Sequence, residues 1–252
     1  MLISMIAALA LLTPVQAAVT VSPKILLPVV IENPLPGALG SLWSSRVDMY
    51  YGGNLVLPTV EGSAICHFDP CLGLEGLASG TTYVNVPVPM ISGSIGKFLY
   101  VRPAEALPDL AIYLRVFDIS QSAMDRGTQI PVVPETAALR QRIELLSVAI
   151  APPFRSMLRI YDFDPDSSHA VLVSIFLPGP NHGILLDTRL LPMAQPADPH
   201  TFPGYAQLDL SYLADRAREV QVEVAPATDG LRFWAFVSTT NNQTQRVTLS
   251  TP

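Results

Sequence analysis

The sequence predicts an all-β protein built from two tandem antiparallel β-sandwich domains that follow a signal peptide. Three observations indicate this class. Short apolar runs alternate with polar residues at the period of a half-buried strand, and turn residues separate them at regular spacing. The chain contains 24 prolines, which end helices and are tolerated mainly at strand edges and in turns. One strand-like segment also occurs twice, 111 residues apart.

The first 17 residues have the layout of a secretory signal peptide. Residues 1–12 are almost wholly apolar, and Val15-Gln16-Ala17 offers small residues before a cleavage point after Ala17. The apolar run is short for a membrane span. No Lys or Arg precedes it, so a buried N-terminal strand or a membrane anchor is the alternative. The signal-peptide pattern predicts a secreted or extracytoplasmic protein. The two domains are expected at 18–136 and 137–252.

The composition excludes several classes of protein. Hydrophobic residues make up 49% of the chain and charged residues 14%, a balance that supports packed cores and argues against disorder. The chain has 15 basic and 21 acidic residues and a pI near 5.1, so it lacks the basic surface of a nucleic-acid-binding protein. No other apolar run approaches membrane-spanning length, and we expect no membrane span after signal cleavage.

The repeated segment covers residues 42–53 and 153–164, which align without a gap. Both copies alternate apolar and polar residues, as a half-buried strand does. The aligned pairs are Trp43 with Phe154, Ser45 with Ser156, Val47 with Leu158, Met49 with Ile160, and Tyr50 with Tyr161.

About seven short strands are expected in each unit. Residues 134–142 join the units through a short helical turn, and Gly127 and Gly230 precede last strands, where a turn often requires positive φ. Each unit is expected to end in a closing hairpin of two runs joined by a polar turn, 110–118 with 128–135 and 219–226 with 231–238. The predicted strands are 24–32, 42–53, 54–60, 81–89, 97–101, 110–118 and 128–135, then 142–150, 153–164, 170–177, 184–191, 206–213, 219–226 and 231–238.

The strand pattern aromatic-x-Ser-x-[Val/Leu]-x-[Met/Ile]-Tyr, in two units behind a signal peptide, resembles functionally uncharacterised exported bacterial proteins with tandem immunoglobulin-like domains. The resemblance covers most of the mature chain in pattern and implies an immunoglobulin-like sandwich. It carries over no catalytic residues. Immunoglobulin domains have a Cys pair between their sheets with a Trp packed on it, whereas the two Cys here lie five positions apart.

The segment 159–173 places Asp162, Asp164 and Asp166 at alternate positions, as an EF-hand calcium loop does. The sixth position is Ser167 where the loop requires Gly, and the twelfth is Val173, which cannot supply the closing carboxylate. Two interpretations follow. One is a hairpin loop with the aspartates as turn residues, and the other is a calcium site completed by an acid from elsewhere.

The stretch 66–71 contains Cys66 and Cys71, which we expect to form a local disulfide in an oxidising compartment. The alternative is a metal site that adds His67 and Asp69, but zinc sites usually draw on two separated ligand pairs.

Other candidate sites carry weaker signals. His182 and His200 lie near Asp187 and Asp198 in loops of the second unit and could form a metal cluster, or be solvated loop residues. The aromatics at 233 and 234 point in opposite directions on one strand, so one of them is expected to reach the surface or a domain interface.

No catalytic motif is present: the chain lacks Gly-x-Ser-x-Gly and a phosphate-binding loop. The sequence therefore favours a non-catalytic exported protein that binds a protein or glycan partner, or serves as a structural element, at the cell envelope or surface. Two alternatives remain. One is an extracytoplasmic hydrolase or carbohydrate-active enzyme with its site at the domain interface, and the other is a calcium-dependent adhesion module. No cofactor besides calcium is expected.

Overall fold

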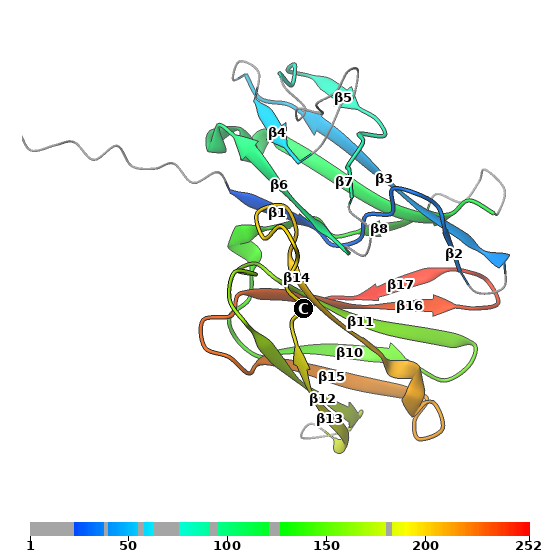
Figure 1. The fold of residues 1–252 in the computed structure, drawn as a ribbon. Helices are drawn as coiled ribbons and strands as arrows, with labels where there is room; N and C mark the ends of the chain where they lie inside the picture. Colours follow the sequence, from blue (N-terminus) through cyan, green and yellow to red (C-terminus); the bar gives the residue numbers. More distant parts are fainter. Residues whose placement is uncertain are drawn as a thin grey trace, which may run out of the picture.

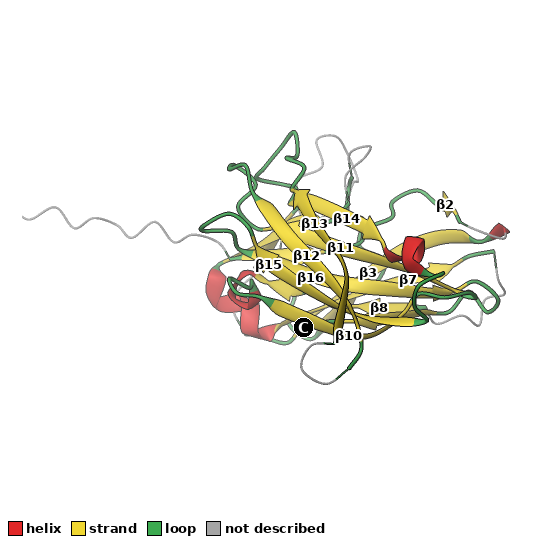
Figure 2. Cartoon of the chain, turned by 90° about the horizontal axis from the view of Figure 1, so that it is seen from below, coloured by secondary structure: helices red, strands yellow, loops and turns green. Residues whose placement is uncertain are grey.

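The computed structural model describes residues 23–37, 40–54, 58–62, 76–90, 95–120, 127–179 and 183–252, so the predicted signal peptide lies outside the described residues. The protein is all-β, as the sequence predicts, and its strands form antiparallel sheets (Figures 1 and 2). Helical structure in the described residues consists of short 3-10 turns, among them η2 (Ala104–Asp109), η3 (Glu135–Ala137) and η5 (Leu210–Leu213). No described helix is long and apolar enough to cross a membrane.

Two sheets come from the first half of the chain. Sheet A has the strand order β4-β6-β1-β9, and sheet B has the order β2-β3-β7-β8, with β5 also paired to β3. Their bounds are β1 Lys24–Leu27, β2 Leu35–Pro36, β3 Leu42–Tyr51, β4 Thr59–Glu61, β5 Thr81–Tyr83, β6 Lys97–Arg102, β7 Leu110–Asp118, β8 Thr128–Ile130 and β9 Val133–Pro134.

The other two sheets come from the second half. Sheet C has the order β14-β11-β16-β17, and sheet D has the order β10-β15-β12-β13. Their bounds are β10 Ile143–Ala149, β11 Phe154–Asp162, β12 Ala170–Leu177, β13 Ile184–Pro192, β14 Gly204–Asp209, β15 Glu219–Pro226, β16 Phe233–Asn241 and β17 Val247–Ser250.

The strands of the two halves pair in the same pattern. The repeated strands β3 and β11 each lie inside their sheet. On β3, β7 pairs along one edge and β2 and β5 pair along the other, whereas β11 lies between β14 and β16. A further strand continues each row, β8 beside β7 and β17 beside β16. The remaining sheets correspond as β4-β6-β1 and β12-β15-β10.

One expected pairing is wrong. The runs at 219–226 and 231–238 do not pair as the closing hairpin of the second unit, because β15 belongs to sheet D and β16 to sheet C. The hairpin that corresponds to β7–β8 is β16–β17, which follows one strand later. Gly127 and Gly230 do have positive φ, at 67° and 81°, as the turns before β8 and β16 require.

Three apolar layers hold the sheets together. One core lies between sheets A and B, and includes Leu27, Met49 and Leu99. A second lies between sheets C and D, and includes Leu158 and Val222. The third layer joins sheet A to sheet C and consists of Leu26, Phe98, Tyr100, Val133, Tyr161, Phe163, Trp234 and Phe236. The sheets therefore stack in the order B, A, C, D.

This order explains why two strands are apolar at consecutive positions. Sheets A and C are covered on both faces, so neither face needs the polar residues that a half-exposed strand carries. Residues 98–101 of β6 are apolar or aromatic and buried, as are the first five residues of β16. Phe233 belongs to the core between sheets C and D, whereas Trp234 belongs to the layer between A and C. The expectation that one of these two aromatics reaches an interface is thus confirmed.

Candidate functional site

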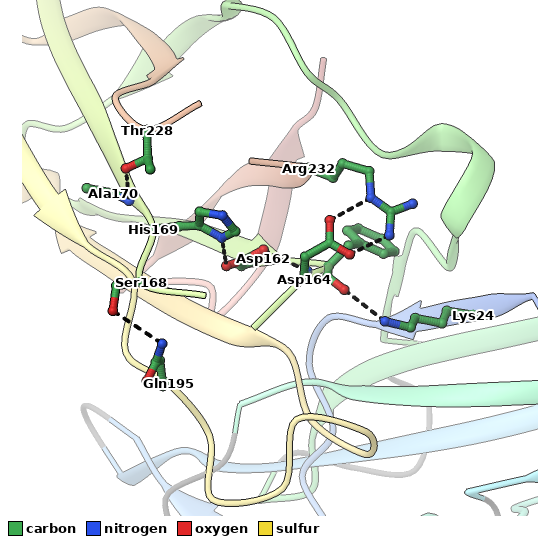
Figure 3. A network of polar contacts seen from close by, with 10 residues as sticks. Lys24, Asp162, Asp164, Ser168, His169, Ala170, Gln195, Thr228 and Arg232 are labelled. Carbon is green, nitrogen blue, oxygen red and sulfur yellow. Dashed lines mark hydrogen bonds and ion pairs between the residues drawn. The ribbon is translucent and has the colours of Figure 1, made fainter. Parts of the chain in front are cut away.

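The aspartate segment continues from the end of β11 into the loop that leads to β12 (Figure 3). It is not a hairpin loop, because β11 lies in sheet C and β12 in sheet D. The Asp162 side chain is fully buried, and its Oδ2 lies 2.6 Å from Nδ1 of His169. Its Oδ1 accepts a hydrogen bond of 2.8 Å from the backbone N–H of Asp164. Burial raises the pKa of Asp162, and the bonds to Asp164 and His169 oppose that rise.

Asp164 faces the other way and binds Arg232. The guanidinium donates from Nε to Oδ2 at 2.6 Å and from Nη2 to Oδ1 at 2.5 Å, which is a bidentate ion pair. Arg232 also reaches Glu135, with 2.8 Å between Nη1 and Oε1. Hydrogen bonding to Arg232 lowers the pKa of Asp164. Asp166 is exposed.

These contacts form an interface clamp, which we define as Lys24, Glu135, Asp164 and Arg232. Lys24 belongs to sheet A, and its Nζ donates to the carbonyl of Phe163 at 3.0 Å. Its backbone N–H donates to Oε2 of Glu135 at 3.2 Å. The clamp therefore ties the beginning of β1 to the end of β11, beside the apolar layer between sheets A and C.

The carboxylates of Asp162 and Asp164 thus point to different partners. The part of the chain that the structure describes contains no group of three or more His, Cys, Asp or Glu side chains placed to hold a metal ion. A calcium ion at this loop would have to compete with Arg232 for Asp164. The calcium site stays a prediction.

The remaining predicted residues that the structure describes do not form one cluster, although Asp198 accepts a hydrogen bond of 3.1 Å from the backbone N–H of His200. Cys66 and Cys71 lie outside the described residues, as does His182. His200 stacks on Tyr100, with ring centroids 4.4 Å apart. Asp187 instead accepts a hydrogen bond from the Tyr212 hydroxyl at 2.5 Å, on the strand β13.

A cleft of about 380 Å³ lies between the two halves of the chain. Its position follows from strand lengths: β1 has four residues and β9 has two, whereas β3, β7, β11 and β16 have nine or ten. Sheet A therefore ends before its neighbours do. Beyond the end of sheet A, the faces of sheets B and C that are turned toward it continue and enclose the cleft. Its volume is in the range of small-molecule sites, roughly 300–1,000 Å³.

The two walls of this cleft differ in chemistry. The wall from the first half is apolar and consists of Val29, Ile31, Leu35, Pro36, Gly37, Trp43, Val116 and Ile130. The wall from the second half supplies every charged or hydroxyl side chain, and consists of Arg155, Arg159, Phe236, Ser238, Thr240 and Val247.

Gly37 is required for the shape of the apolar wall. A Cβ at this position would lie 2.4 Å from Nε1 of Trp43 and 2.2 Å from Oγ of Ser41. Both distances are too short for real contacts, so a side chain would push Trp43 out of its place beside the cleft.

The two arginines of the polar wall have different surroundings. Arg159 donates to the Ser238 hydroxyl, and its guanidinium carbon lies 5.8 Å from the centre of the Phe236 ring. Arg155 is exposed, and among the described residues its guanidinium has no ion pair or hydrogen bond. The described lining residues include two arginines and no carboxylate, so their charge is positive although the whole chain has a net charge of −6.

A smaller hollow of about 230 Å³ adjoins the cleft and shares Trp43, Val116 and Val247 with it. Its described lining adds a third arginine, Arg246, and includes no acidic residue. The positive charge therefore extends along the junction of sheet B with β17, where the Thr128 hydroxyl donates to the carbonyl of Val247 at 2.9 Å.

Sequence reasoning missed this cleft. Arginines on the polar face of a half-buried strand are ordinary, and only the docking of sheet C against the first half turns them toward an apolar wall. A signal was nevertheless present in the repeat. At the positions that align with Arg155 and Arg159, the first copy has Ser44 and Asp48, so the basic pair belongs to one copy alone.

The cleft does not offer the groups of the predicted enzyme alternative. Glycoside hydrolysis requires two carboxylates that flank the scissile bond, and nucleophilic catalysis requires a base beside the nucleophile. Among the described residues that line the cleft there is neither a carboxylate nor a histidine. Their chemistry suits binding of an anionic or amphipathic ligand. Comparisons with protein-family models, curated proteins and solved structures give no match for this chain.

Proposed function

We propose that this chain is a non-catalytic exported binding protein of the cell envelope or surface. It consists of two tandem immunoglobulin-like β-sandwich domains, and its ligand occupies the cleft between them. The observation that carries the proposal is the cleft itself, with an apolar wall from one half and an unpaired Arg155 on the other. The signal-peptide pattern of residues 1–17 and the repeated strand-pairing pattern support export and the tandem arrangement.

The experiment uses a substitution that fills the cleft. Ser238 lines it from β16, so Ser238→Trp places an indole in the cavity. The matched control is Ser174→Trp on β12 of sheet D, at a strand position on a face away from the cleft.

Purified wild type and both variants are incubated with an extract of the organism's own cell envelope, and retained molecules are identified by native mass spectrometry. We expect the wild type and Ser174→Trp to retain the same ligand and Ser238→Trp to lose it, with all three equally folded by circular dichroism. A ligand retained by Ser238→Trp would place binding elsewhere, and retention of no ligand by the wild type would refute the proposal.

A further inference from the structure

We infer that the cleft binds an alkyl carboxylate, with the chain on the apolar wall and the carboxylate at Arg155. This inference rests on the proposed function, because it names the ligand class of the same cleft. Three features of the walls carry it: the separation of apolar from polar residues, the one guanidinium left without a partner, and the aliphatic character of the apolar wall.

Because apolar residues line one wall of the cleft and polar residues line the other, the cleft favours an amphipathic ligand. Most of the apolar wall is aliphatic, and its largest exposed member is Leu35, which is 55% exposed. A polar ligand such as a sugar would leave its hydroxyls without partners against this wall, and unpaired buried polar groups are costly. A wholly apolar ligand would bury Arg155 and Thr240 on the other side without a partner. A molecule with one apolar and one anionic end satisfies both walls.

The arrangement of charge favours a carboxylate over a phosphate. Arg155 presents a planar fork of donors that matches one carboxylate in bidentate geometry, and Thr240, its cross-strand neighbour, adds a hydroxyl beside it. Arg159 is four positions away along an extended strand and is already bonded to Ser238. The described lining residues thus offer one free guanidinium, whereas a phosphate dianion is typically held by several converging donors.

The role of Arg159 follows from its contacts. Because its guanidinium lies over Phe236 and bonds Ser238, it fills the inner part of the polar wall and keeps the potential of the cleft positive. Arg155 is the more exposed of the two. The carboxylate therefore lies at the open side of the cleft, and the alkyl chain extends inward toward Ile31, Trp43 and Ile130.

The inference is tested by isothermal titration calorimetry at neutral pH with three probes of equal chain length: decanoate, decanol and decyl phosphate. The proteins are wild type, Arg155→Gln, Arg155→Lys and the matched control Arg140→Gln. Arg140 is exposed and lies outside the cleft, so its substitution removes the same charge from the chain.

We expect saturable binding of one decanoate per chain, at least tenfold tighter than decanol. Arg155→Gln should weaken decanoate binding about tenfold because a charge-assisted bidentate contact is lost. Arg155→Lys should restore only part of it, and Arg140→Gln should bind like the wild type. Equal affinity for decanol and decanoate, or tighter binding of decyl phosphate, would overturn the inference.

The two proposals can fail separately. If Ser238→Trp abolishes retention of an envelope ligand while decanoate does not bind the wild type, the cleft is a binding site for another class of molecule, and the carboxylate inference alone is wrong. If the wild type retains no envelope ligand and binds no decanoate, both are wrong. An envelope ligand identified as a peptide with a free C-terminus would also overturn the alkyl assignment.

Discussion

At the scale of single residues, the aspartates that look most like chemistry in the sequence have structural partners in the fold. Asp162 is buried with His169, and Asp164 joins Arg232 and Glu135 in the interface clamp. The spacing of the acids could be read from the sequence, but their partners could not, because Arg232 is 68 positions from Asp164. Only the pairing of β11 with β16 brings them together.

The clamp leads to a prediction for Arg232→Gln. The substitution leaves Asp164 and Glu135 without their shared cation, and we expect the free energy of unfolding to fall by about 1–2 kcal/mol, because the pair is part-exposed and screened by solvent. Arg232 lowers the pKa of Asp164 in the folded state. The contribution of the Asp164–Arg232 ion pair to the free energy of unfolding is therefore fully present above the ordinary aspartate pKa of about 4. It is lost as the pH falls through the lowered pKa of Asp164.

Urea denaturation of both proteins at pH 7 and at pH 3 measures this effect. The stability difference between wild type and Arg232→Gln should shrink on acidification. Asp166→Asn is the control, because Asp166 is an exposed acid of the same loop, and it should leave the midpoint unchanged at pH 7. A difference that grows at pH 3 would contradict the assigned role of the ion pair.

At the scale of elements, the alternation of apolar and polar residues predicted the positions of the strands well, but it did not predict which strands pair. The segments 153–164, 170–177 and 184–191 correspond closely to β11, β12 and β13. The expected hairpin of 219–226 with 231–238 was wrong, since alternation tells which face of a strand is buried and carries no information about which sheet the strand enters. The cleft was missed for the same reason, because it depends on where sheet A ends relative to sheets B and C.

The aligned serines of the repeated strand do have matching roles. The Ser45 hydroxyl accepts from the backbone N–H of Ile31 at 2.7 Å, just beyond β1. The Ser156 hydroxyl donates to the carbonyl of Ala149 at 2.5 Å, at the end of β10, and is 2.7 Å from the Thr239 hydroxyl. In both halves the serine ties the repeated strand to the chain segment that precedes it.

We therefore expect Ser156→Ala to lower the free energy of unfolding by about 1–3 kcal/mol, because it leaves the Thr239 hydroxyl and a backbone carbonyl without this partner in a buried place. Ser168→Ala, at an exposed loop position, should be close to neutral. A double-mutant cycle with Thr239→Val measures the coupling. A coupling energy near zero would show that the two hydroxyls do not depend on each other.

At the scale of the whole molecule, the layer between sheets A and C joins the two halves as a core would. Phe98 is fully buried and lies 5.6 Å from Phe163 between ring centroids. The Tyr100 hydroxyl donates to the carbonyl of His200 at 2.6 Å, and the backbone N–H of Phe98 donates to the carbonyl of Thr201 at 2.8 Å. Large apolar contact between two halves favours one cooperative unit over independent motion. The proposed binding site has walls from both halves, so it also requires a fixed junction.

The wild type should therefore unfold in a single calorimetric transition with equal calorimetric and van't Hoff enthalpies.

Phe98→Ala removes a buried ring from the layer between sheets A and C and should lower the free energy of unfolding by about 3–5 kcal/mol. Because both separate cores remain, we expect the transition to broaden or to divide in two, with loss of the proposed ligand binding at the cleft. Val222→Ala, inside the core between sheets C and D, is the matched control. It should lower the midpoint of the single transition without broadening or dividing it, because the contact between the halves is unchanged. Two transitions in the wild type itself would mean that the halves unfold independently and that the apolar layer does not join them into one cooperative unit.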